Sequence, residues 1–148
     1  MYTLRLTLVS MLALTSVSAS AGLRELGTDY RMLRSNYTML ETIQDRCPDF
    51  KIPEMVDKQT VNKELEAKLG YDMFARIYGE VAKSDLKLKA KKTVNTLFEQ
   101  IEGCEDPKLL AVVNRIAEVQ GETYARFTAE PAAAVAPNAV PVPMRRSE

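Results

Sequence analysis

The chain contains no histidine, and only two of its 148 residues are cysteine, Cys47 and Cys104. Without histidine, no Ser-His or Cys-His nucleophile pair can form, and histidine-based zinc or haem sites are excluded. The two cysteines also lack the Cys-x-x-Cys spacing that lowers the pKa of a redox-active thiol. The chemistry that remains for catalysis is that of carboxylates, lysine and tyrosine.

Long apolar runs are also scarce. The run from Leu6 to Val17 covers about 12 residues and is broken by Ser10, Thr15 and Ser16, whereas a transmembrane helix needs about 20 apolar residues. Arg5 precedes the run and Ala19-Ser20-Ala21 follows it, an order typical of a secretory signal peptide. We expect residues 1–21 to be a signal peptide that is cleaved after Ala21, or alternatively after Ala19. A retained transmembrane anchor is the competing interpretation.

The expected mature chain has almost no net charge. Removal of Arg5 with the signal peptide leaves 19 basic and 20 acidic residues, a formal net charge of −1. Nucleic acids are bound mainly by neutralising their phosphates with Lys and Arg, so we expect no nucleic-acid partner. No later run is long enough to span a bilayer, so no stable membrane insertion is expected. The Ala-x-Ala site and the Ala/Pro-rich C-terminus favour the Gram-negative periplasm over a eukaryotic secreted protein.

Composition changes at Pro131. Residues 131–148 contain four of the seven prolines, each of which lacks an amide donor and has a restricted backbone angle. We interpret this segment as a disordered tail, with a proline-rich docking peptide as the alternative. The folded domain is then residues 22–130.

Residues 22–130 have helical rather than strand periodicity. The first predicted helix ends near Arg46, before Pro48, and Gly27 and Thr28 favour a start nearer Asp29. Its apolar stripe repeats with a period near 3.5 residues and consists of Leu23, Leu26, Tyr30, Leu33, Tyr37, Leu40, the polar Gln44, and Cys47.

Caps and apolar spacing predict the remaining helices. The second begins near Pro53 and ends at Gly70, the third begins near Asp72, and the last runs from Asp106-Pro107 to about Ala129. Ser84-Asp85 can cap a fourth that ends at Gly103, although the third and fourth could also be one helix. The predicted buried residues of these helices are Val61, Leu65, Leu69, Phe74, Ile77, Tyr78, Val81, Ala90, Val94, Leu97, Phe98, Ile101, Leu109, Val113, Ile116, Tyr124 and Phe127. The fold class is all-α, a bundle of four to five helices.

Cys47 and Cys104 each follow a predicted helix. In an oxidising compartment two such cysteines pair, and the bridge would close a loop of about 57 residues, worth roughly 4 kcal/mol in the chain-entropy model. We therefore predict a single structural disulfide that staples the bundle.

Two sets of side chains are candidates for a partner surface. Lys83, Lys87 and Lys91 are four residues apart, so on one continuous helix they would form a positive ridge. Met32 and Met39 would widen an apolar surface on the first helix if they are exposed. A solvated helix face and ordinary core packing are the alternatives.

Carboxylates are the remaining candidates for catalysis. Glu99 and Glu102 lie close together, and Glu105 and Asp106 follow the second cysteine. An envelope-polymer hydrolase could use one buried glutamate as an acid, but these residues read as a solvated helix end. Their spacing does not match a calcium-binding loop, and we predict no metal, no cofactor and no catalytic residue.

Taken together, these features predict a small periplasmic or secreted helical protein that acts by protein-protein interaction. It would be an accessory, adaptor or inhibitor-type protein, and not an enzyme, whose partner is another envelope or secreted protein. A homodimer through the first helix, an envelope-polymer hydrolase or lyase, and a holdase chaperone are the alternatives. In size, compartment and single disulfide the chain resembles acid-protective periplasmic chaperones, immunity proteins against cell-wall-degrading toxins, and accessory subunits of secretion systems. That resemblance assigns no role to any residue.

Overall fold

The computed structural model describes residues 16–132, with side chains from residue 22 onward. Over this range the chain forms five helices and no strand, which confirms the all-α prediction. They are α1 (Ser16–Arg46), α2 (Lys58–Leu69), α3 (Tyr71–Lys83), α4 (Leu86–Phe98) and α5 (Pro107–Ala129). Most of the predicted signal peptide, residues 1–15, and the tail from residue 133 lie outside the described residues.

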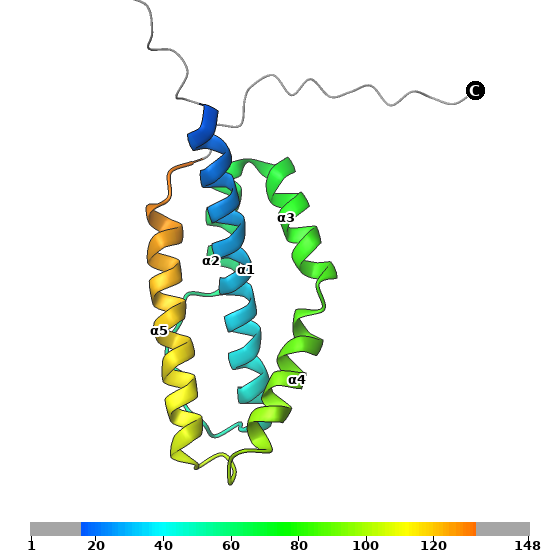
Figure 1. The fold of residues 1–148 in the computed structure, drawn as a ribbon, viewed down its shortest axis with the longest axis vertical. Coiled ribbons are helices and arrows are strands. Elements are labelled where there is room, and N and C mark those ends of the chain that lie inside the picture. The colour runs from blue at the N-terminus through cyan, green and yellow to red at the C-terminus, as the bar shows by residue number, and fades with distance from the viewer. Residues whose placement is uncertain (1–15, 133–148) are drawn as a thin grey trace, which may run out of the picture.

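Helix α1 is at the centre of the bundle (Figure 1). Helix α5 lies on one side of it, α3 and α4 follow one another along the other side, and α2 lies behind. The chain descends through α1, rises through α2, descends through α3 and α4, and rises again through α5. Five helices therefore make a four-column, up-and-down bundle.

Two hydrophobic clusters form the core, and α1 contributes to both. The upper cluster consists of Leu26, Tyr30, Leu33, Val61, Leu65, Leu69, Ile77, Val81 and Phe127. The lower cluster consists of Leu40, Ile43, Cys47, Val94, Leu109 and Val113. Most of these residues were predicted to be buried. Ile43 was missed, because the predicted stripe used Gln44 at that turn, and a helix of 3.6 residues per turn drifts away from a 3.5-residue repeat.

A polar contact lies where α1 passes from the upper cluster to the lower one. Gln120 of α5 is buried, and its Nε2 donates to the carbonyl oxygen of Leu33 at 3.2 Å. Thr123, one turn further along α5, is also buried. Periodicity read from apolar residues alone cannot find these two positions. Their burial shows that α5 packs against the backbone of α1 as well as against its side chains.

Capping aspartates mark the starts of α2 and α5. Asp57 accepts hydrogen bonds from the backbone N–H groups of Gln59 and Thr60, and Asp106 accepts one from Lys108. The Thr60 hydroxyl also donates to Asp57, and the backbone N–H of Glu102 also donates to Asp106. These bonds, together with the cap bonds, favour the charged carboxylate and lower the pKa of both aspartates. The Asp106-Pro107 start is confirmed, whereas the start near Pro53 is wrong.

An extended segment replaces the predicted first turn of the second helix. Phe50, Ile52 and Met55 precede Asp57 and pack against the lower cluster. This segment therefore covers the lower half of the bundle, and α2 with its cap at Asp57 covers only the upper half.

The predicted start of the first helix near Asp29 is also wrong, because α1 continues through Gly27 and Thr28. A Cβ placed on Gly27 would lie 3.9 Å from Ile77 Cδ1, so a side chain of α3 reaches this turn, and the preceding residue, Leu26, is fully buried in the upper cluster. Tertiary packing therefore offsets the intrinsic helix penalty of glycine, about 1 kcal/mol relative to alanine.

An elbow at Ser84 and Asp85 separates α3 from α4 and answers the question that the sequence left open. Ser84 ends α3, and its hydroxyl donates to the carbonyl oxygen of Val81 at 2.6 Å. Asp85 has a left-handed backbone with φ of 51° and makes no side-chain cap hydrogen bond. Asp85 is the residue before α4, as predicted, but its side chain does not cap the helix. Helix α4 also ends earlier than expected, at Phe98 instead of near Gly103.

The disulfide between Cys47 and Cys104 is present, with the two Cα atoms 5.8 Å apart. It joins the end of α1 to the turn that precedes α5. Cys47 is part of the lower cluster, whereas Cys104 is exposed. The predicted staple is confirmed, and it closes the end of the bundle opposite the α2–α3 turn.

The upper end of the bundle brings the start of α1 against the end of α5. A Cβ placed on Gly22 would lie 2.9 Å from Oε1 of Glu130. Lys68 of α2 donates to the carbonyl oxygens of Thr128 and Glu130 and so caps α5. If cleavage occurs after Ala21, the new ammonium group of Gly22 is therefore created beside the Glu130 carboxylate.

Removal of the disulfide should strongly destabilise the fold. We expect the C47A/C104A variant to lose about 4 kcal/mol of unfolding free energy, because a bridge over a loop of this length restricts the unfolded chain. Urea unfolding followed by circular dichroism measures the difference. An unchanged midpoint in the double variant would contradict this role.

Glu130 should stabilise the chain that begins at Gly22 more than a chain that begins at Ser16. In the shorter chain the Glu130→Gln substitution removes an ion pair to the N-terminal ammonium, so it should lower the melting temperature. The ordinary pKa of an α-amino group is about 7.7–8.0, so the effect should be present at pH 7 and disappear near pH 10. Thermal unfolding of both chains, with and without the substitution, tests this; equal effects in the two chains would exclude the ion pair.

Candidate functional site: a charged groove along the first helix

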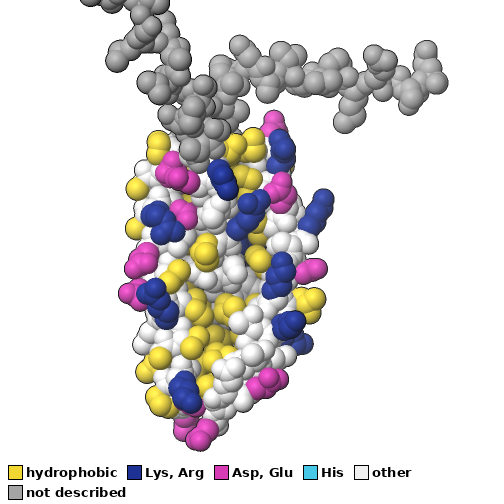
Figure 2. Space-filling view, in the orientation of Figure 1, with side chains coloured by type: hydrophobic (Ala, Val, Ile, Leu, Met, Phe, Trp, Pro, Cys, Tyr) yellow, Lys and Arg dark blue, Asp and Glu magenta, His cyan; other side chains and the backbone are white. Residues whose placement is uncertain are grey.

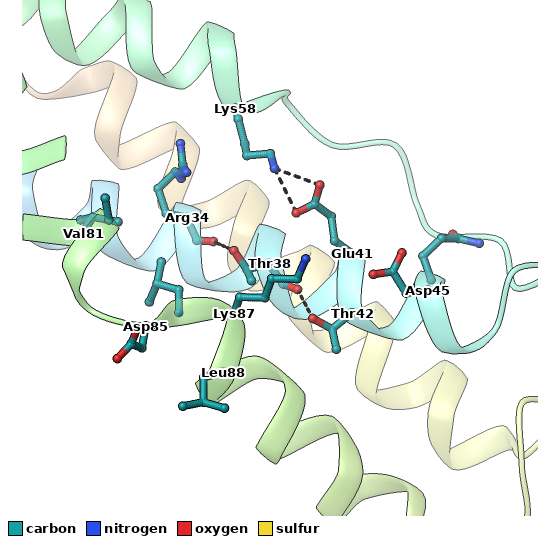
Figure 3. A pocket seen from close by; sticks show the side chains of 13 residues that line it. Arg34, Thr38, Glu41, Thr42, Asp45, Lys58, Val81, Asp85, Lys87 and Leu88 are labelled. Atoms are coloured by element: carbon teal, nitrogen blue, oxygen red, sulfur yellow. Dashed lines mark hydrogen bonds and ion pairs between the residues drawn. The ribbon is translucent and has the colours of Figure 1, made fainter. Parts of the chain in front are cut away.

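A groove of about 690 Å³ lies between α1 and the elbow that joins α3 to α4 (Figure 3). Helix α1 forms one wall, the start of α2 adds Lys58, and the elbow forms the other wall. The lining residues are Arg34, Thr38, Glu41, Thr42, Gln44, Asp45, Lys58, Val81, Ala82, Asp85, Leu86, Lys87 and Leu88. Since the chain changes direction at Asp85, the elbow is what leaves this side of α1 open.

The α1 wall follows from helical spacing. Arg34, Thr38, Glu41 and Asp45 are three or four residues apart and therefore share one face. The hydroxyl groups of Thr38 and Thr42 donate to backbone carbonyl oxygens four residues earlier, at 2.8 and 2.7 Å. Their protons are thus used within the helix, and the charged side chains dominate this wall.

Lys58 connects α2 to the groove. Its Nζ donates to both carboxylate oxygens of Glu41, at 2.9 and 3.0 Å, and lies 4.7 Å from the ring centroid of Tyr37. The side chains of Lys58 and Glu41 remain 36% and 46% exposed. Because exposed ion pairs contribute little to stability, this pair shapes the wall more than it stabilises the fold.

Arg34 occupies the upper end of the groove. Its Nη1 donates to Asn62 Oδ1 at 3.3 Å, and its guanidinium carbon lies 5.8 Å from the ring centroid of Tyr78. Asn62 Oδ1 also accepts from the hydroxyl of Tyr30 at 2.8 Å, and burial raises the pKa of that hydroxyl. The positive charge of Arg34 is therefore held in place by contacts from α2 and α3.

A second hollow of about 340 Å³ continues the groove down α4. It shares Thr42, Asp45 and Lys87 with the first, and Arg46, Lys91, Val94 and Asn95 complete it. Nη1 of Arg46 donates to Asn95 Oδ1 at 2.8 Å, and the guanidinium carbon lies 4.1 Å from the ring centroid of Phe98. We call the two hollows together the α1–α4 groove.

The α1–α4 groove has an excess of positive charge. Its cationic side chains are Arg34, Arg46, Lys58, Lys87 and Lys91, and its anionic ones are Glu41, Asp45 and Asp85. Glu41 is already paired with Lys58, and in Figure 3 Lys87 reaches toward α1 while Asp85 points away from it. Among residues 22–132, no ion pair engages Arg46, Lys87 or Lys91. Three cations therefore face the lower half of the groove without an anionic partner in that range.

The predicted lysine ridge is divided between two places. Lys87 and Lys91 line the groove, whereas Lys83 is the last residue of α3 and lines neither hollow. The three lysines do not lie on one continuous helix, because the elbow separates Lys83 from Lys87. The groove thus contains two of the three predicted lysines.

Met32 and Met39 lie on a different side of α1 from Arg34 and Glu41, because two residues correspond to about 200° around a helix. Met32 is 43% exposed, and Met39 is partly buried against the lower cluster. Figure 2 shows one face of the molecule, on which hydrophobic side chains gather between α5 and α4 while lysine and arginine lie to either side, along α5 and along α3 and α4. The methionines and the lysines do not form a single surface.

Of the acidic residues near the second cysteine, Asp106 accepts backbone hydrogen bonds and the glutamates are exposed to solvent. Asp106 caps α5 and also accepts a hydrogen bond from the backbone N–H of Glu102 at 2.9 Å. Glu99 directly follows α4, and Glu99, Glu102 and Glu105 are exposed. Over residues 22–132, no cluster of three or more metal-binding side chains is positioned to hold an ion.

Most of the groove was not foreseen. Arg34, Glu41 and Asp45 are spaced as one polar face of α1, which the sequence pattern could have revealed. Lys58 and Lys87 join that face only through the packing of α2 and α4, which no local pattern encodes.

Comparisons with protein-family models, with curated proteins and with solved structures found no match for this chain. Of the helices between residues 16 and 132, none combines the length and apolar character needed to cross a membrane.

The backbone at Asp85 should control the elbow. Asp85→Val should lower the free energy of unfolding by about 1–2 kcal/mol, because a β-branched side chain is strained at positive φ. Asp85→Gly should have little effect, since glycine adopts this conformation freely. Chemical denaturation of the two variants tests the difference, and equal stability would mean that the left-handed turn is not retained in solution.

Proposed function

We propose that this chain is an exported, non-catalytic binding protein of the periplasm that recognises another envelope or secreted protein through the α1–α4 groove. The observation that carries the proposal is the set of three cations, Arg46, Lys87 and Lys91, that face an open groove without an anionic partner among residues 22–132.

The composition of the groove is that of a recognition surface. Polar and charged side chains come from three helices, and Leu88 at its edge is 67% exposed. Protein interfaces combine apolar contacts with a polar rim. An accessory, adaptor or inhibitor-type protein needs such a surface and a scaffold that holds its shape. The disulfide next to Arg46 and the caps at Asp57 and Asp106 supply that scaffold.

The partner should be found at the groove by position-specific photo-cross-linking in a Gram-negative host that makes the protein. With a benzoylphenylalanine at position 88, we expect one discrete adduct with a second protein, identified by mass spectrometry. Leu110 provides the matched control, because it is an exposed leucine of α5 and lines neither hollow. The same photoreactive residue at position 110 should give no such adduct.

Two results would contradict the proposal. Adducts of equal yield at positions 88 and 110 would show non-selective contact. An adduct between two copies of the chain would show that the groove forms a homodimer and does not bind a different protein.

A further inference from the structure

Two cations of the lower groove are set at a defined distance. Lys87 and Lys91 are one turn apart on α4, which corresponds to about 6 Å along the helix axis. Both side chains are exposed and both line the second hollow. Between them and α1, the buried Val94 forms an apolar floor.

Arg46 is the third cation, and its position is fixed. Stacking on Phe98 and the hydrogen bond to Asn95 hold the guanidinium plane, and the disulfide at Cys47 fixes the end of α1 next to it. An arginine has five N–H donors, and its planar fork matches the geometry of a carboxylate. A preorganised guanidinium loses less conformational entropy when it binds such a group.

The shape of this site selects among anionic partners. A hollow of about 340 Å³ with an apolar floor admits side chains and does not match a flat lipid surface. Its lining residues include no aromatic ring on which a base could stack. Asp45 is its single carboxylate, so a ligand with several carboxylates gains more attraction than repulsion.

We infer that the lower half of the α1–α4 groove binds an acidic segment of the partner protein, with carboxylates about 6 Å apart seated against Lys87, Lys91 and Arg46. In an extended segment, alternate residues have nearly this spacing, about 6.6 Å. The inference rests on the proposed function and adds the chemistry of the partner to it.

The test uses the chain from Gly22 to Glu148 with its disulfide intact and measures fluorescence anisotropy. The probe is a fluorescein-labelled hexapeptide of alternating glutamate and leucine, and its glutamine analogue is the uncharged control. We expect the glutamate peptide to bind at least tenfold more tightly than the glutamine peptide. Its affinity should fall as ionic strength rises, because the attraction is screened by salt.

Two double variants separate the site from general surface charge. K87E/K91E should weaken binding of the glutamate peptide at least tenfold. K89E/K92E changes the charge of α4 by the same amount at exposed positions that line neither hollow, and should change the affinity less than twofold. If K87E/K91E does not fold by circular dichroism, K87Q/K91Q takes its place with the same expected direction.

Each outcome has a defined meaning. Equal losses in the two double variants would overturn the inference, because the attraction would then be diffuse. Equal affinity for the glutamate and glutamine peptides would also overturn it. If the peptides do not bind but position 88 still gives a discrete adduct, the acidic segment is wrong and the proposed binding function stands. If neither occurs, both are wrong.

Discussion

Burial of the apolar side of α1 is the constraint on which the rest of the structure depends. Leu26 and Leu33 anchor the upper cluster, Leu40 and Ile43 anchor the lower one, and no other helix contributes this fully to both. Because one rigid helix joins the two clusters, the elements around it must cover its whole length. Helix α5 does so alone, with its Gln120 bonded to the α1 backbone. On its other sides, α1 is covered by pairs of shorter elements: α3 and α4 on one side, and α2 with the segment that precedes it on another.

Those shorter pieces explain the shape of the groove. In the α3–α4 column, Val81 belongs to the upper cluster and Val94 to the lower one. Helix α4 packs directly on α1, whereas α3 packs mainly on α2. The chain changes direction at Asp85, and a space remains between this elbow and α1. The side of α1 that faces this space is polar, since it has no apolar cover. A charged groove is thus a consequence of how the core is divided.

The disulfide has a second consequence besides stability. Cys47 directly follows Arg46, so the bridge that ties α1 to the turn before α5 also fixes the residue that forms the end of the groove. Stacking on Phe98 and the hydrogen bond to Asn95 then orient the guanidinium. A staple that stabilises the fold therefore also holds in place the cation to which the proposal assigns binding.

Local sequence determined the helical class, the Asp106-Pro107 start, the Gly70 end and most of the core, because caps and apolar spacing act over one or two turns. The disulfide was also predictable, since only two cysteines were available to pair. Tertiary structure decided the burial of Gln120, the continuity of α1 through Gly27 and the division of the lysines at the elbow. It also decided the groove, in which Arg34 and Arg46 come from α1, Lys58 from α2 and Lys87 from α4. Each of these depends on contacts between residues far apart in sequence, which local periodicity does not encode.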